Sequence, residues 1–96
     1  MALRYKSSGV LTADALVKTG KGTLHTITIS MDDAAPTAGS FTLFDNTAES
    51  GTELFSHTFD TTRIGPLSVI LDVEFGTGLY AGFTTTGDVN VVISYI

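Results

Sequence analysis

The stretch GTLHTITIS, residues 22–30, decides the fold that this sequence predicts. Apolar residues alternate in it with Thr and Ser, and a period of two sends one set of side chains to a buried face and the other to solvent. The same alternation recurs over residues 40–44 and 89–93, with Gly, Asp, Asn and Pro between the runs. The chain is therefore predicted to be all-β.

Working outward from this stretch, the alternation predicts strands over residues 22–30, 40–45, 53–59, 67–75, 79–85 and 89–96. Residues 3–6 fit a short edge strand or an arm, and residues 9–18 fit either a helical turn or the start of a strand. Short strands separated by frequent turns favour a small antiparallel β-sandwich that resembles a jelly roll. One face of each strand would build the core, from Ile27, Ile29, Phe41, Leu43, Phe55, Phe59, Val69, Leu71, Val73, Ala81, Phe83, Val91 and Ile93.

The 96 residues fit one domain, with residues 1–21 as an N-terminal arm with the first short strand or strands and residues 22–96 as the β-sandwich body. Charge divides the chain at the same place. Residues 1–21 carry four basic residues and one acid, whereas residues 22–96 carry one basic residue and nine acids. The acidic body argues against nucleic-acid binding. The basic segment is predicted either to dock on an acidic neighbour, including a second copy, or to be an ordinary strand with solvated lysines.

Composition narrows the function further. Only 16% of the residues are charged, against a typical share of about 25%, which favours burial of part of the surface in an assembly over a monomer with a dense core. The absence of cysteine excludes disulfides and thiolate metal sites. No apolar run approaches the ~18 residues of a membrane span, and the N-terminus lacks the apolar region of a signal peptide. We expect a product made in the cytoplasm, without membrane contact.

No catalytic motif interrupts the rhythm of the strands, so we expect no enzyme, no cofactor, no metal and no small-molecule ligand. His25 alternates in phase with Ile27 and is expected to face inward, and His57 is in phase with Phe55. A metal site would need further converging ligands. The pairs Asp32-Asp33 and Asp45-Asn46 are interpreted as turn residues, and Asp72 and Glu74 as the solvated outer side of a strand.

Six residues are candidates for contacts between subunits. Phe44 is out of phase with Phe41 and Leu43 and should face the opposite side of its strand. Tyr95 and Ile96 give the last strand an apolar end, which suggests that this strand is held inside the sheet or against a neighbour. The other candidates belong to the basic N-terminal segment: Arg4, Tyr5 and Lys6.

Three stretches together resemble small virion proteins of tailed bacteriophages. They are residues 22–30, residues 38–52 with the sequence AGSFTLFDNTAESGT, and residues 71–80 with the sequence LDVEFGTGLY. In that group, a loop of small residues leads into a strand that ends in an aromatic residue and Asp-Asn, and a D-V-x-F-x-x-G-L-Y step precedes the last hairpin. The resemblance covers residues 18–96 and contains no catalytic residue.

The resemblance implies a structural role in the virion, most simply that of a capsid decoration, or cement, protein. Such proteins form homo-oligomers, several of them trimers, and bind the major capsid protein on the outside of the head. The alternative is a tail, baseplate or head–tail component, possibly with a receptor- or carbohydrate-binding role. The lack of Trp and the presence of only three Tyr weaken the carbohydrate-binding alternative.

Overall fold

The computed structural model describes residues 5–31, 39–59, 67–84 and 89–96, and all regular structure in these ranges is β-strand. Each of the six strands predicted between residues 22 and 96 is present within two residues of its predicted ends, whereas the first strand begins at Lys6 and runs to Leu11. Residues 9–18 contain the end of this strand and most of a second strand instead of a helical turn. The strands are β1 (Lys6–Leu11), β2 (Ala15–Thr19), β3 (Gly22–Met31), β4 (Gly39–Asp45), β5 (Thr52–Phe59), β6 (Leu67–Phe75), β7 (Gly78–Phe83) and β8 (Val89–Tyr95).

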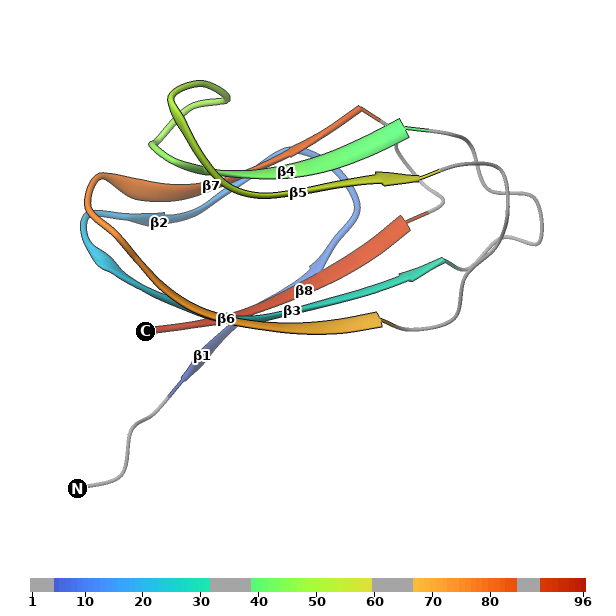
Figure 1. Ribbon diagram of the computed structural model, residues 1–96, viewed down its shortest axis with the longest axis horizontal. Helices are drawn as coiled ribbons and strands as arrows, with labels where there is room; N and C mark the ends of the chain where they lie inside the picture. The colour runs from blue at the N-terminus through green and yellow to red at the C-terminus, as the bar shows by residue number, and fades with distance from the viewer. Residues whose placement is uncertain (1–4, 32–38, 60–66, 85–88) are drawn as a thin grey trace.

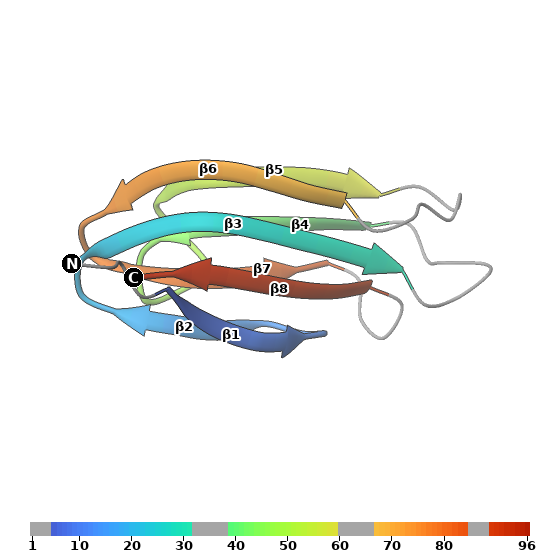
Figure 2. The same cartoon turned by 90° about the horizontal axis from the view of Figure 1, so that it is seen from below.

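The strands form two four-stranded antiparallel sheets, with the orders β1-β8-β3-β6 and β2-β7-β4-β5. The pairs β1–β8, β2–β7, β3–β6 and β4–β5 are those of one long hairpin folded at β4–β5. Rolling this hairpin adds the pairs β3–β8 and β4–β7. This is the connectivity of an eight-stranded jelly roll, which confirms the predicted fold class. The two sheets face each other in Figure 1, and Figure 2 shows β8 and β3 between β1 and β6.

The N-terminal segment is built into both layers. β1 is an edge strand of the first sheet and β2 is an edge strand of the second. Residue 21, where the sequence analysis divides arm from body, lies in the turn between β2 and β3. The described part of residues 1–21 therefore contributes to the same sandwich as residues 22–96, and only Tyr5 precedes the first strand in that part.

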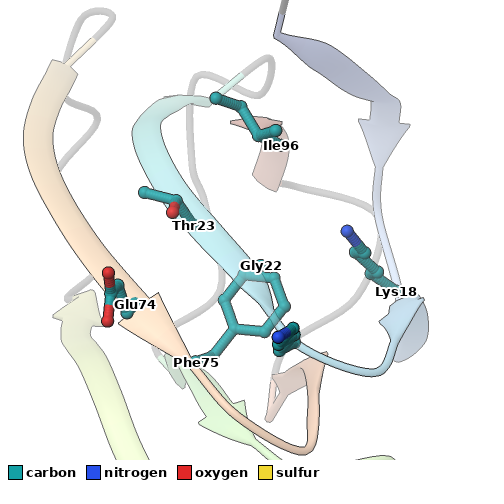
Figure 3. A pocket seen from close by; sticks show the side chains of 7 residues that line it. Lys18, Gly22, Thr23, Glu74, Phe75 and Ile96 are labelled. Carbon is teal, nitrogen blue, oxygen red and sulfur yellow. The ribbon is translucent and has the colours of Figure 1, made fainter.

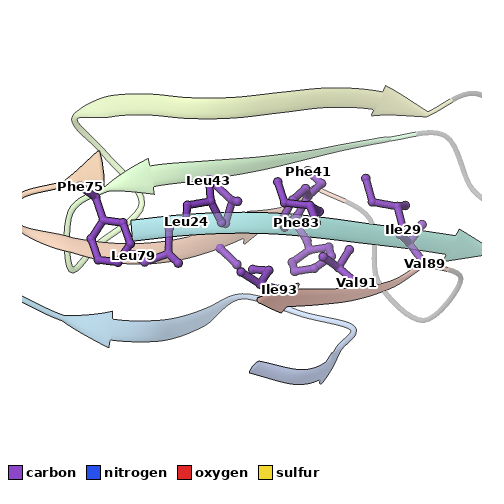
Figure 4. Packing of buried hydrophobic residues seen from close by; sticks show 12 residues of the cluster. Leu24, Ile29, Phe41, Leu43, Phe75, Leu79, Phe83, Val89, Val91 and Ile93 are labelled. Atoms are coloured by element: carbon purple, nitrogen blue, oxygen red, sulfur yellow. The ribbon is translucent and has the colours of Figure 1, made fainter. Parts of the chain in front are cut away.

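The core lies between the two sheets (Figure 4). Most of the predicted core residues are buried there, and Phe55 and Leu71 pack against them while partly exposed. Val69 and Val73 are also predicted core residues, but they are half-buried and do not belong to this cluster. The side chain of Phe59, a further predicted core residue, lies outside the described part of the structure. The buried set also includes residues that the alternation does not predict. It consists of Leu24, Ile27, Ile29, Phe41, Leu43, Phe75, Leu79, Ala81, Phe83, Val89, Val91 and Ile93.

The prediction that His25 faces inward is wrong, because the ladder is irregular at this residue. Leu24 pairs with Val73 and Thr26 with Ile70, so two residues of β6 oppose His25 alone. Relative to β8, however, β3 itself has the extra residue, because Leu24 pairs with Tyr95 and Thr26 pairs with the adjacent Ser94. The unmatched His25 shifts the alternation within β3. Leu24 is consequently fully buried although it is out of phase with Ile27, and the ring of His25 lies on the outer side of the sheet.

All four edge strands carry a bulge. Each of β1, β2, β5 and β6 holds an additional residue relative to its neighbour. In β1, the Ser8 hydroxyl accepts a hydrogen bond from the Ile93 backbone N–H at 2.8 Å, which satisfies a donor that the irregular ladder would otherwise leave unpaired. In β6, Asp72 adopts a positive φ of 50°. Bulged edges are poor templates for pairing with a strand of another chain.

Candidate functional site

A groove with a volume of about 460 Å³ opens at the end of the sandwich where β2 leads into β3. Its walls come from strands that are distant in sequence, and Figure 3 shows their side chains around the start of β3. Both basic and apolar groups contribute. The lining residues are Lys18, Lys21, Gly22, Thr23, Glu74, Phe75 and Ile96.

Gly22 allows the walls of this groove to approach each other. A Cβ atom at this position would lie 2.3 Å from the Ile96 carbonyl oxygen and 2.7 Å from the Phe75 ring, closer than real atoms approach. Ile96 is held there by two backbone hydrogen bonds with Thr23, of 2.9 and 3.1 Å. Phe75 is 2% exposed and closes the floor. The lack of a side chain at residue 22 is therefore a packing requirement.

The groove is basic on one side. Lys18 and Lys21 line it from β2 and the following turn, and Lys18 Nζ lies 3.0 Å from the position that a Gly22 Cβ would occupy. Neither ammonium group forms an ion pair with another described residue, and Glu74 is the acidic residue of the lining. The groove can therefore accept an anionic group beside an apolar one.

Asp45 fixes the turn that follows Phe75. Its carboxylate accepts hydrogen bonds from the backbone N–H groups of Gly76 at 3.0 and 3.1 Å, Thr77 at 2.8 Å and Gly78 at 3.4 Å. These bonds, that of Gly76 most strongly and then that of Thr77, hold the pKa of Asp45 below its ordinary value of 3.8, because they favour the charged form. Asp45 thus joins the end of β4 to the β6–β7 turn beside the groove.

A second polar cluster lies on the outer side of the first sheet. The ring of Tyr5 stacks on the ring of His25 with centroids 4.0 Å apart and an angle of 12°. His25 Nδ1 contacts Asp72 Oδ1, and the Asp72 side chain is 59% exposed. The cluster links the residue that precedes β1 to β3 and β6, and it assigns Asp72 a partner that the sequence analysis did not foresee.

The outer face of the first sheet carries no charged side chain over its central rows. Val10 pairs with Val92, and Thr28 pairs with both Val92 and Ser68. The hydroxyl groups of Thr28 and Ser68 are 3.2 Å apart. Val10 is 66% exposed, and Ile70 is 70% exposed. We call this surface the uncharged face; it consists of Ser7, Val10, Thr26, Thr28, Ser30, Ser68, Ile70, Asn90, Val92 and Ser94.

The outer face of the second sheet is different. Phe44 lies there opposite Tyr80, as its phase in the sequence predicts, and Leu16 is the partner of Tyr80 on the other side. The β4–β5 connection lies against β7, because a Cβ on Gly82 would meet the Glu49 side chain at 2.8 Å. This face is therefore partly covered by the chain itself.

The structure brings four of the six predicted contact residues to one end of the sandwich. Lys6 pairs with Tyr95, Tyr5 precedes Lys6 in the chain, and Ile96 lines the groove. Tyr95 packs against the core, and Phe44 lies on the other sheet. Arg4 falls outside the described residues.

His57, in β5 opposite Phe41, is half-buried. Within residues 5–31, 39–59, 67–84 and 89–96, no three His, Cys, Asp or Glu side chains are grouped as metal ligands. The acidic pair 32–33 lies outside these ranges. In the part of the chain that the structure describes, no helix has the length and hydropathy needed to cross a membrane.

Comparison with known proteins adds no identification. No protein-family model matches the chain, and neither a curated protein nor a solved structure shows significant similarity to it.

We expect Gly22→Ala to destabilise the fold by about 1–3 kcal/mol, because the added methyl group overlaps the Ile96 backbone and the Phe75 ring. Urea denaturation followed by circular dichroism measures the change. Gly76→Ala is the matched control, since no atom lies within 4 Å of a Cβ at that position. Equal stabilities of the two variants would contradict the packing role of Gly22.

Asp45→Asn should lower stability at neutral pH and make the remaining stability less sensitive to acid. The pKa of Asp45 is lowered by folding, so its carboxylate stabilises the protein above the unfolded value of 3.8. That contribution disappears as pH falls through the lower pKa of the folded state. Denaturation midpoints of the two proteins between pH 2 and 7 should therefore converge at the acidic end. Glu53→Gln, an exposed change in β5, should follow the unmodified protein; a constant offset for Asp45→Asn would count against this linkage.

Proposed function

We propose that this protein is a non-enzymatic structural protein of a tailed-phage virion that decorates the outside of the capsid and stabilises it. The resemblance of residues 18–96 to small phage virion proteins supports this role. The jelly-roll fold is compatible with it, because viral capsid proteins are among the proteins that use this architecture. Lectins and cupins use it too, so the proposal depends on the surface and not on the fold alone.

The observation that carries the proposal is the uncharged face. Charged side chains are depleted at the centres of protein interfaces, because a buried charge without a partner is costly. Here the central rows of a sheet surface consist of hydroxyl, amide and β-branched side chains, and Val10 and Ile70 among them are mainly exposed. Covering such a surface with a protein partner costs little free energy of desolvation. We propose that it contacts the capsid.

The bulged edges support contact through this face and not through added strands. Each edge strand interrupts its own ladder, which disfavours strand addition by another chain. A homo-oligomer, most simply a trimer, would present several copies of the uncharged face to the shell at once. Because several copies of the face would bind at once, the oligomer would attach tightly even though each single interface is modest.

The location of the protein in particles tests the role. Particles of the virus that encodes the chain, separated into heads and tails, should contain it in the head fraction, at a copy number that matches a repeated capsid position. The purified protein should sediment as an oligomer, with a trimer expected. Its presence only in tails would favour the alternative role in a tail or baseplate, and its absence from particles would contradict both.

A lysine in the centre of the uncharged face should prevent attachment. Thr28→Lys is expected to weaken binding to undecorated capsids by about tenfold or more, because the ammonium group would be buried without a partner. Co-sedimentation with capsids measures the loss. Thr42→Lys is the matched control, since Thr42 forms the equivalent hydroxyl pair with Ser56, also at 3.2 Å, on the second sheet. Comparable weakening by both variants, with both folded, would refute the assignment of the face.

A further inference from the structure

The groove at the end of β2 carries two ammonium groups that form no ion pair with an acid in the described part of the chain, although Glu74 lines the same groove. We propose, on the premise of the decoration role, that this groove binds a carboxylate side chain of an acidic and partly apolar peptide segment of the capsid partner. Docking on an acidic neighbour is one of the two alternatives for the basic segment, and the proposal assigns that contact to Lys18 and Lys21.

The position of the groove links it to the uncharged face. Thr23 pairs with Glu74 and forms backbone hydrogen bonds with Ile96, so these residues make up the next outward-facing row of the same sheet. Only the row of Leu24 and the bulge at His25 separate them from Thr26, where the uncharged face begins. A partner that covers this face would therefore extend over the groove.

The positive charges of Lys18 and Lys21 determine which chemical group such a partner must bring to the groove. A covering protein removes water from Lys18 and Lys21, and an ammonium group that loses water without gaining a partner is costly. A carboxylate meets that need. Lys6, in β1, is exposed and does not line the groove, so a partner seated in the groove would meet Lys18 and Lys21 and not Lys6.

The shape of the groove adds an apolar requirement. Its volume of about 460 Å³ lies within the range of about 300–1,000 Å³ that ligand sites occupy. Ile96 supplies apolar surface above the almost completely buried Phe75, and Glu74 across the groove from Lys18 disfavours a second anion there. An acidic side chain beside an aliphatic one fits this arrangement, with its carboxylate toward the lysines (Figure 3).

Titration of the ¹⁵N-labelled full chain with a short peptide tests the proposal. The probe is acetyl-Glu-Leu-Glu-amide, and the neutral control of the same shape is acetyl-Gln-Leu-Gln-amide. The acidic peptide should shift the amide signals of Gly22, Thr23, Phe75 and Ile96 in a saturable manner, and the shifts should weaken as salt is added. The neutral peptide should leave these signals in place.

Variants identify the groups responsible. The double variant Lys18→Gln/Lys21→Gln should weaken binding of the acidic peptide by about fivefold to tenfold, the effect of losing two partly exposed charge pairs. Lys6→Gln, a lysine outside the groove, should bind as the unmodified protein does. Absent shifts, equal shifts with the neutral peptide, or an unchanged affinity of the double variant would overturn the proposal.

Two further results distinguish peptide binding in the groove from general anion binding and from the decoration role. Acetate at the same carboxylate concentration should give much smaller shifts; shifts as large as those of the peptide would make the groove a general anion site and overturn the peptide assignment. Capsid binding that the double variant retains in full would refute the groove while leaving the decoration role intact. Peptide binding by a protein that is absent from particles would refute the decoration role while leaving the groove.

Discussion

The structure depends on one constraint, which is that each strand must bury one set of side chains against the facing sheet. The sandwich is thin, and its core is essentially a single layer of apolar side chains from both sheets. β3 and β8 contribute to it from the centre of the first sheet, and β4 and β7 from the centre of the second. Apolar burial between the sheets is the dominant favourable term in folding. The side chains on the outer faces are not needed for this core and can therefore form contacts with other molecules.

The bulges determine which side chains point outward from the sheets. His25 is an additional residue of β3 relative to β8, which shifts the alternation of β3. Leu24 is therefore in the core, and the imidazole lies outside, in contact with Tyr5 and Asp72. The same type of irregularity in the edge strands interrupts ladders that would otherwise invite further strands. Bulges therefore have two consequences here: they place polar groups between the uncharged face and the groove, and they make the edge strands poor templates for pairing with another chain.

The sequence predicts the strands and most of the core because both depend on local alternation. Residues 67–75 coincide with β6, and Ile27 and Ile29 are buried as predicted. The orientation of His25 could not be predicted, because a bulge depends on the register between two strands and leaves no mark in either one. The groove escaped prediction for a related reason. Lys18, Phe75 and Ile96 meet only after the long hairpin has rolled up, and the donors to Asp45 belong to a turn more than 30 residues away. Three-dimensional proximity of this kind has no periodic signal.

The uncharged face and the groove have complementary physical properties. A flat surface of hydroxyl and β-branched side chains contributes contact area with little desolvation cost, but it hardly distinguishes one orientation of a partner from another. Two lysines without ion-pair partners contribute less contact area, but they restrict the orientation of a partner more strongly. A misplaced partner would remove water from both ammonium groups without supplying a carboxylate to either. If the two surfaces act together, the contact area of the uncharged face gives most of the affinity, and the two lysines fix the position of the partner. The decoration role that we propose would require both, because it places each copy at one defined position on a repeating shell.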